Sequence, residues 1–453
     1  MRESYWLPER LFWSAYLATR MRGQQGIPFW SRERLEKVQN LRVRKIVRFA
    51  SRYVPYYMEL FRAQGMRHEE FRTIEDLYRI PVLNPLQVRK NPDQFRPGRI
   101  SLDTLKLVSS GTTGVPRWVH HDAVSLFNNA AHGERIRSFY PLSKGGSRNY
   151  KEAMIVAPLG SSAQEVQKYN LMKAWLPQRT RVERKYFSML NSMDSIIKGL
   201  NEFRPDVIRA YGSGLNMLFE EVFRTGRDFH LPDLLVYAAD SIAPAVKRKI
   251  KDELGIPVFS IYSCVECLQV GFECREHRGY HLNEDCYPVR IVDDHHRPLP
   301  DGATGRVIVS NLINRATVLL NYELGDEGKI LPGKCGCGRT QRILSLNISR
   351  VADRLKLENG TQIHPITFAE AVYWEKDLWQ HQVVQSSESE FEVFLVVAPW
   401  ADRDAMKQRL ATEFEKWFQG AFRFNMQFVD QIEMTPGGKQ RAVVLMPTEG
   451  GYQ

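Results

Sequence analysis

The amino-acid sequence predicts an α/β protein with a large N-terminal domain, whose sheets are mainly parallel with an antiparallel subdomain, and a small α+β C-terminal domain. The first observation is a set of short β-rich runs between about residues 150 and 265, two of them followed by helical stretches. Such alternation is typical of right-handed βαβ units in a parallel sheet. The second observation is a change to antiparallel strand patterns over 285–330. The third is a smaller α+β pattern after about residue 350.

Length and composition fit an ordinary globular protein. The 453 residues predict roughly two to four domains and are ample for a large core. An aromatic content of 11% excludes disordered and low-complexity classes. No run of about 18 uninterrupted apolar residues exists, so we expect no membrane span. Residues 1–21 lack the continuous apolar core of a secretory signal, so we expect a cytoplasmic protein.

The N-terminal segment is basic. Residues 1–60 hold twelve Lys/Arg against five Asp/Glu, which is +7 of the net +11. This favours either an electropositive face for nucleic acid, anionic lipid or an anionic cofactor, or a solvated helix surface, and we prefer the solvated surface. Apolar residues recur at helical spacing over 33–63, and Pro55 should end or kink that helix. Residues 75–99 are a proline-rich connection.

The remaining elements are predicted from residue patterns in chain order. Strands of the parallel sheet are expected at 154–158, 206–212, 234–240 and 257–263, with helices at 213–226 and 241–255. Ligands of such sheets bind beyond the carboxyl ends of the strands. Antiparallel strands are expected at 287–294, 305–311 and 316–326. The C-terminal part predicts a strand pair, a helix and a terminal strand at 381–385, 391–399, 401–420 and beyond a glycine-rich loop.

The sharpest local feature is the loop SSGTTGVPR at 109–117. Backbone N–H groups of a loop dense in Ser, Thr and Gly can approach an anion, and the hydroxyls add donors. Arg117 adds a fixed positive charge for phosphate oxygens. The loop is not a Walker A motif, and a plain flexible loop is the simpler alternative. We favour a phosphate site formed by Ser109, Ser110, Gly111, Thr112, Thr113, Gly114 and Arg117.

This loop resembles the phosphate loop of the adenylate-forming superfamily of acyl-CoA synthetases and adenylation domains. Four further motifs follow in the family's order: YSCVE at 262–266, YELGD at 322–326, RVAD at 350–353 and TPGGK at 435–439. They resemble the family motifs Y-G-x-T-E, Y-x-x-G-D, the hinge R-x-x-D and the loop with the catalytic lysine. The chain also resembles the phenylacetate–CoA ligase-like branch, through VPYY at 54–57, GYHLNED at 279–285 and PGKCGCGR at 332–339.

The resemblance implies a reaction. A carboxylic acid, expected to be aromatic, would be activated with ATP and Mg²⁺ as an acyl-adenylate, with release of pyrophosphate, and the acyl group would pass to coenzyme A. It also implies three domain segments, with a mobile small domain: an N-terminal helical segment at 1–100, an adenylation core with a zinc-binding antiparallel part at 101–349, and a C-terminal domain at 350–453.

The resemblance also implies roles for single residues. The loop at 109–114, with Thr113 as a catalytic member, would hold the β- and γ-phosphates, and Glu266 would help to hold Mg²⁺. Tyr262 would lie against adenine, and Asp326 would accept hydrogen bonds from the ribose hydroxyls. The simpler interpretation of Glu266 is a surface carboxylate after a strand.

Four more residues match motif positions nearer the hinge and the C-terminus. Asp240 would contact adenine, although a helix N-cap is an alternative. Arg350 would contact ribose or phosphate, and Asp353 would lie at the hinge. Lys439 would bridge the substrate carboxylate and the α-phosphate and neutralise charge in the transition state. Its alternative is a solvated loop lysine.

The cysteines suggest a metal. All six lie between Cys264 and Cys337, too few for a disulfide scaffold but strongly clustered. The favoured set for a tetrahedral structural Zn²⁺ is Cys274, His281, Cys335 and Cys337, and the branch often carries a similar set. A rival set is Cys264, Cys267, Cys335 and Cys337. Buried free thiols are the plainest alternative, and His277 and Cys286 are reserves.

Other functions compete with acid–CoA ligation. Transfer of the acyl group to an amine, or adenylation of another oxyanion without coenzyme A, would use the same nucleotide site. A non-enzymatic alternative is a basic, zinc-containing nucleic-acid-binding protein. A degenerate nucleotide-binding scaffold is disfavoured because Glu266, Asp326 and Lys439 are intact. We therefore expect a small-molecule acid and coenzyme A or an amine as partners, without nucleic acid, and a homodimer is left open.

Overall fold

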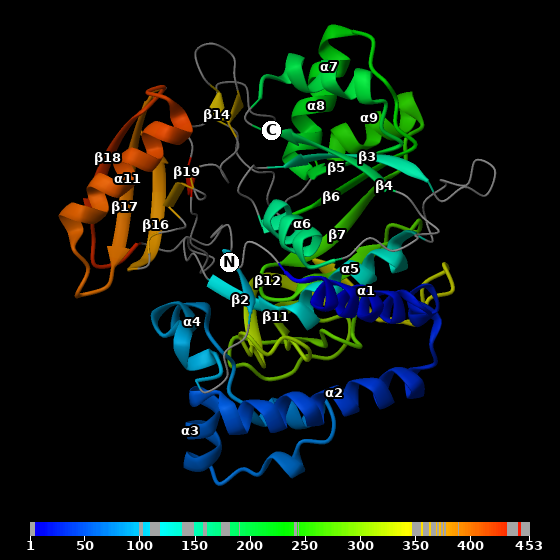
Figure 1. The fold of residues 1–453 in the computed structure, drawn as a ribbon, viewed down its shortest axis with the longest axis vertical. Helices are drawn as coiled ribbons and strands as arrows, with labels where there is room; N and C mark the ends of the chain where they lie inside the picture. The colour runs from blue at the N-terminus through cyan, green and yellow to red at the C-terminus, as the bar shows by residue number, and fades with distance from the viewer. Residues whose placement is uncertain are drawn as a thin grey trace. The chain divides into compact units, whose positions relative to one another are not determined.

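The computed structural model consists of two compact units (Figure 1). The first contains Met1–Asn84, Asn91–Leu107 and Val119–Ser349, and the second contains Pro85–Lys90, Val108–Trp118 and Arg350–Gln453. The described residues are 5–98, 103–108, 118–137, 149–156, 161–173, 182–189, 191–239, 242, 244–346, 355–356, 362–363, 368, 371–372, 375, 377–387, 389–432 and 443–444. The α/β class with a large sheet-rich unit and a small C-terminal unit is confirmed.

A large sheet dominates the first unit. Across the described residues it has eleven strands, in the order β10-β11-β12-β13-β9-β8-β7-β6-β5-β3-β4. Its parallel half consists of β3 (Tyr150–Val156), β4 (Val182–Ser188), β5 (Val207–Tyr211), β6 (Leu234–Ala238) and β7 (Val258–Cys264). The predicted parallel strands correspond to β3, β5, β6 and β7.

The inner strands β3, β5, β6 and β7 are mostly buried on both faces, which is why they are largely apolar runs. Ile208, Leu235 and Val258 face a core formed with α7 (Met193–Phe203), α8 (Gly212–Thr225) and α9 (Pro244–Leu254). The alternate residues Val207 and Leu234 face a second core, to which α5 (Ala123–Arg137) contributes. In Figure 1, α7, α8 and α9 lie on one side of these strands, and α5 and α6 (Ser161–Met172) lie on the other.

The antiparallel half continues the same sheet. At β8 (Leu268–Glu273) the direction changes, because β7 and β8 pair antiparallel. Antiparallel pairs then follow to the other edge through β9 (Tyr280–Leu282), β13 (Ile343–Leu346), β12 (Tyr322–Leu331), β11 (Gly305–Val309) and β10 (Val289–Val292). The carboxyl end of β7 therefore lies at the seam between the two halves.

The N-terminal helices are α1 (Leu7–Met21), the 3₁₀ helix η1 (Gln24–Phe29), α2 (Arg32–Tyr53) and α3 (Pro55–Ala63). The helix predicted over 33–63 is divided at Pro55, as expected for a residue without a backbone N–H. Ser31 caps α2 by accepting a hydrogen bond from the Arg34 amide. The proline-rich connection forms η2 (His68–Glu70), η3 (Glu75–Arg79), α4 (Pro85–Lys90) and η4 (Pro92–Phe95).

One predicted strand begins later than expected. The pattern over 316–326 predicts a strand throughout, but residues 316–321 are a buried irregular segment and β12 begins at Tyr322. Tyr57 holds this segment, because its hydroxyl donates to the Val318 carbonyl and accepts from the Leu320 amide. Asn321 has φ 53° and donates through Nδ2 to the Ile80 carbonyl at 2.7 Å. These tertiary hydrogen bonds take the place of the inter-strand backbone hydrogen bonds that a β-strand at 316–321 would form.

The second unit has a four-stranded sheet in the order β18-β17-β16-β19. Its strands are β16 (Leu378–Gln385), β17 (Glu390–Val397), β18 (Arg423–Phe428) and β19 (Val443–Val444), and α11 (Arg403–Phe418) packs on it. Phenylalanines fill its core, and the rings of Phe414 and Phe424 stack at 4.2 Å. Two short pairs complete the described strands: β1 (Thr104–Val108) with β2 (Trp118–Asp122), and β14 (Leu355–Lys356) with β15 (Gln362–Ile363).

Candidate active site

Two sequence motifs meet at the seam of the large sheet and exchange hydrogen bonds. The hydroxyl of Tyr262, on β7, donates to Oδ2 of Asp326, on β12, at 2.7 Å. In the other direction, the hydroxyl of Tyr322, at the start of β12, donates to Oε1 of Glu266 at 3.1 Å. The tyrosine of each motif therefore holds the carboxylate of the other. Residues that are about sixty positions apart in sequence are brought into one constellation.

The two carboxylates lie in different surroundings. Glu266 is 2% exposed and Asp326 is partly exposed. Burial, and then the charge of Asp326, raise the pKa of Tyr262 well above 10, so its hydroxyl remains protonated and remains a donor. Asp326 can therefore keep its bond to Tyr262 while presenting negative charge near the surface.

The turn that carries Glu266 is fixed from three sides. It connects β7 to β8, and its closing residue Leu268 has a positive φ of 60°. Asn311 donates through Nδ2 to the Glu266 carbonyl at 2.8 Å. His121, on β2, donates through Nε2 to the Val265 carbonyl at 2.7 Å. Such anchoring orders a carboxylate before any ligand binds.

His121 and Asn311 were not predicted as site residues. Burial lowers the pKa of His121 to about 4, so its imidazole is neutral and accepts the Ser125 hydroxyl at Nδ1, 3.0 Å away. The available signal was polar residues in strand-like runs, HH in WVHHD and N in GRVIVSN. Buried polar groups in such runs must find partners, and here the partners are backbone groups of the Glu266 turn.

Several predicted site residues lie outside the described part of the chain. These are Ser109, Ser110, Gly111, Thr112, Thr113, Gly114, Arg117, Asp240, Arg350, Asp353 and Lys439. Strand β1 ends just before residues 109–117, and strand β2 begins just after them. The two strands pair with each other.

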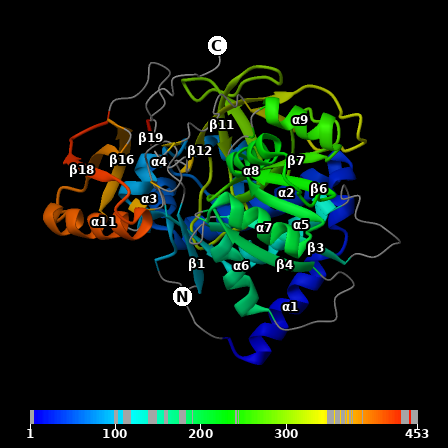
Figure 2. The same cartoon turned by 90° about the horizontal axis from the view of Figure 1, so that it is seen from above.

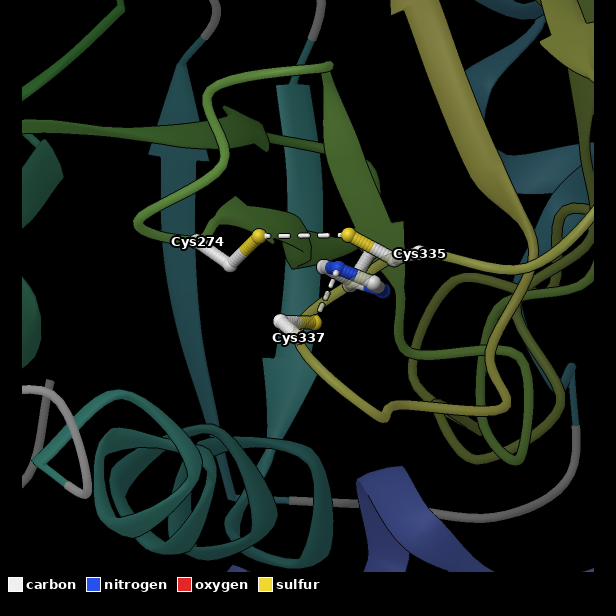
Figure 3. A group of neighbouring side chains, drawn as sticks. Cys274, Cys335 and Cys337 are labelled. Carbon is white, nitrogen blue, oxygen red and sulfur yellow. Dashed lines mark hydrogen bonds between the residues drawn. The ribbon is translucent and has the colours of Figure 1, made fainter.

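A cysteine–histidine group lies elsewhere in the antiparallel half of the sheet. Cys274, His281, Cys335 and Cys337 place one ligand atom each within 4.8 Å of one another, which is an arrangement able to hold a metal ion. Figure 3 shows the sulfur atoms of its three cysteines turned toward one another. The Sγ atoms of Cys274 and Cys335 are 3.6 Å apart, and Sγ of Cys337 is 3.4 Å from Nε2 of His281. The structure thus assembles the favoured set, whereas Cys264 and Cys267 lie in and beside the Glu266 turn.

The chemistry of this group suits a metal. All six cysteines lie in described residues and are free, and a separation of 3.6 Å is far beyond the roughly 2.05 Å of a disulfide. Burial, and then the charge of Arg339, lower the pKa of His281 to about 4. Its imidazole is therefore neutral, which is the form that binds metals.

A second buried group is an ion-pair cluster rather than a metal site. His132, Asp285 and Cys286 also gather ligand atoms within 4.8 Å. Two arginines occupy the carboxylate, however: Arg135 forms two bonds with Asp285, at 2.7 and 2.9 Å, and Arg42 forms a third at 2.9 Å. Burial alone would raise the pKa of Asp285, but these charges outweigh it and hold the pKa below its usual range. Two guanidinium groups at this carboxylate disfavour a further cation.

The GYHLNED segment is therefore a tie between elements. Asp285 connects α2 and α5 through their arginines. The adjacent Glu284, which is fully buried, pairs with Arg32 at 2.7 Å and with Arg342. His281, four residues earlier, belongs to the cysteine group. This motif, which the sequence indicated only as a family resemblance, has a structural role here, because it anchors α2 and α5 to the sheet.

Among the described residues, no helix is long and apolar enough to cross a membrane.

Comparisons with known proteins agree with the fold. The family model of the CapK C-terminal domain matches residues 355–445. Phenylacetate-coenzyme A ligase of Thermus thermophilus is 28% identical over 356 residues, which cover 75% of this chain and 75% of that protein. Protein CapK of Staphylococcus aureus is 20% identical over 414 residues, 90% of this chain and 89% of that protein.

A solved structure has the same fold. It is 2-hydroxyisobutyryl-CoA ligase in complex with 2-HIB-AMP and CoA in the thioesterification state, with a TM-score of 0.61 and 17% identity over 93% of this chain and 91% of that one. The chain is thus similar in sequence to phenylacetate-coenzyme A ligases and to CapK, and it shares the fold of an acid–CoA ligase.

Proposed function

We propose that this protein is an ATP-dependent, AMP-forming acid–CoA ligase. It would activate a carboxylic acid as an acyl-adenylate, release pyrophosphate, and transfer the acyl group to coenzyme A. The observation that carries the proposal is the reciprocal tyrosine–carboxylate pairing of Tyr262 with Asp326 and of Tyr322 with Glu266. It brings together the two carboxylates that an adenylating enzyme needs for Mg²⁺ and for ribose.

The proposed roles follow from this geometry. Glu266 lies on a buried, anchored turn, and its carboxylate would hold Mg²⁺, a hard cation that binds to a few carboxylates and to phosphate oxygens. Asp326, at the edge of the constellation, would accept hydrogen bonds from ribose. The bulk of Tyr262 would form part of the adenine wall. Nucleotide phosphates would bind to the loop at 109–117, with Thr113 as a catalytic member.

Residues outside the described part complete the proposed site. Asp240 would contact adenine and Arg350 would contact ribose or phosphate. Lys439 would neutralise charge between the carboxylate and the α-phosphate. Neutralisation is needed because two anions must approach each other for the attack to occur. We propose that the segment from residue 350 is a mobile C-terminal domain that carries this lysine, with Asp353 at the hinge.

The acid is proposed to be aromatic, in line with the relatives that are named phenylacetate-coenzyme A ligase. The test is pyrophosphate release from the full chain with ATP, Mg²⁺ and a panel of aromatic and aliphatic acids, with and without coenzyme A. We expect release that depends on an aromatic acid, and a thioester product when coenzyme A is present. No release with any acid would contradict the enzyme; an amide formed with amines instead would redirect the acceptor.

The variant Asp326→Asn is the site-specific control in this assay. Its amide oxygen can still accept the bond from Tyr262, so the fold should persist, but it loses the charge proposed to bind ribose. We expect the KM for ATP to rise about tenfold, in keeping with one lost charge-assisted hydrogen bond of roughly 1.5 kcal/mol. An unchanged KM for ATP would remove Asp326 from the nucleotide site.

We also propose that the cysteine–histidine group binds a structural Zn²⁺. With Zn–S bonds near 2.3 Å and Zn–N bonds near 2.05 Å, a tetrahedral site has S–S and S–N edges of about 3.8 and 3.5 Å. The separations of 3.6 Å between Cys274 and Cys335, and of 3.4 Å between Cys337 and His281, fit those edges. Four protein ligands complete the coordination, so a metal bound here would link the end of β8, strand β9 and the 335–337 loop.

Replacing Cys335 with serine should remove about one zinc per chain and lower the melting temperature, because a structural site needs all four ligands. Metal content by mass spectrometry and thermal unfolding are the measurements. Cys267→Ser is the matched control, since Cys267 is also buried but lies outside the group. A wild-type protein that is isolated free of zinc, yet folds and works fully, would rule the metal out.

A further inference from the structure

Helix α1 has two apolar faces, but the first unit buries only one of them. A surface helix of a globular protein normally carries a single apolar stripe toward the core and a charged face toward solvent. On α1, Trp13 stacks on Phe127 of α5, with ring centroids 5.2 Å apart, and Leu17 is 7% exposed. The Tyr16 hydroxyl accepts a hydrogen bond from Asn128 at 3.0 Å. This inner face fixes the helix to α5.

The outer face is apolar as well. Leu7, Leu11 and Phe12 are 60%, 45% and 60% exposed, and Trp6, just before the helix, is 69% exposed. Ala15 and Ala18 continue the exposed stripe, so no charged side chain interrupts it between Leu11 and Ala18. Figure 2 shows α1 along the rim of its unit. Large aromatic and aliphatic side chains held in water on a fixed helix point to an interaction surface.

Cations adjoin this face. Arg20 and Arg22 are exposed at the end of the helix, and within the described residues neither has a carboxylate partner. Residues 1–60 carry +7 of the formal charge. An apolar face rich in Trp, Phe and Leu beside basic side chains is the pattern of helices that lie in the interface of an anionic bilayer.

We propose that α1 docks this protein on an anionic lipid surface, with Trp6, Leu7, Leu11 and Phe12 inserted among the headgroups. The size of the surface favours a bilayer over a second copy of the chain. A 15-residue helix is about 22 Å long, and its one exposed stripe is narrow. A stable protein interface needs roughly 800 Å² from each partner. A bilayer accepts a narrow stripe, because the inserted side chains need no matching pocket.

The experiment is co-sedimentation of the full chain with vesicles of phosphatidylcholine alone, or of phosphatidylcholine with 30% phosphatidylglycerol. We expect the wild type to bind the anionic vesicles at least tenfold more than the neutral ones, and 0.5 M NaCl to reduce that binding. The double variant Leu11→Glu/Phe12→Glu should lose at least tenfold in binding. The control Leu231→Glu, at a site 46% exposed against 45% for Leu11, should bind like the wild type.

Pyrophosphate release without vesicles should be the same for the double variant and the wild type, which verifies that the proposed active site is intact in the variant. Failure of the wild type to bind anionic vesicles would overturn the proposal, as would equal binding by the double variant. A wild-type dimer that the double variant converts to a monomer, with no vesicle binding, would assign the face to a second copy and overturn the lipid surface.

Discussion

Replacing Lys439 with alanine is expected to lower acid-dependent pyrophosphate release by about 10²–10³-fold, since one contact that stabilises transition-state charge is worth that much. ATP binding should persist, because the proposed phosphate loop and Asp326 are untouched. Single-turnover release of pyrophosphate and equilibrium binding of ATP separate the two effects. A lower kcat with an unchanged affinity for ATP is the signature of a group that acts mainly in the transition state.

The matched control is Lys416→Ala, an exposed lysine on α11 in the same unit that pairs only loosely with Glu413, at 3.4 Å. We expect it to leave both measurements unchanged. If Lys439→Ala released pyrophosphate at the wild-type rate, Lys439 would have no part in adenylation, and the proposed reaction would need another source of positive charge.

Replacing Arg135 with alanine should lower the free energy of unfolding by about 3–5 kcal/mol, because it leaves a buried carboxylate without its main partner. Arg135 is fully buried and also donates to Gln24 at 2.7 Å and to Asn283 at 2.8 Å. Denaturant unfolding measures the change. The control is Arg224→Ala, which removes an ion pair with Glu221 at the surface. Its free energy of unfolding should change by no more than about 1 kcal/mol.

The difference in free energy of unfolding between the wild type and Arg135→Ala should become smaller at acidic pH. The folded-state pKa of Asp285 is depressed, so its contribution to stability is present above the unfolded pKa of about 4 and is lost as the pH falls toward the folded value. Without Arg135 the carboxyl is more easily protonated, and the variant loses less on acidification. A constant difference between pH 7 and pH 3 would mean that Arg135 acts through packing alone.

The sequence predicted the parallel half of the sheet well because strands buried on both faces are nearly continuous apolar runs. β4 was missed for the opposite reason. It is the edge strand, and Glu183, Arg184 and Lys185 on it are exposed, so its composition resembles a loop. The strand prediction for 316–321 was wrong for another reason. The apolar residues of this segment are buried in an irregular conformation that depends on Tyr57 and Asn321. No local pattern contains those distant partners.

The candidate site likewise contains residues that the sequence predicted and residues that it did not. The motifs predicted Tyr262, Glu266 and Asp326, which the structure brings together, and the ligand atoms of the favoured cysteine–histidine set also lie close together. The partners that fix the Glu266 turn, His121 and Asn311, were not found because each acts on a backbone carbonyl of a distant segment. The buried cluster around Asp285 was also invisible, since helix periodicity gives no reason to place Arg42 and Arg135 at the same carboxylate.

The exchange of hydrogen bonds between β7 and β12 makes the two motifs a single mutational unit. A substitution at Tyr322 alters the setting of Glu266, and a substitution at Tyr262 alters that of Asp326. Effects of residues that share one network do not add. Substitutions in one of these motifs should therefore be accompanied by substitutions in the other during evolution. A chimera that takes only one motif from a distant homologue should lose the matched hydrogen bonds, and one that takes both motifs should keep them.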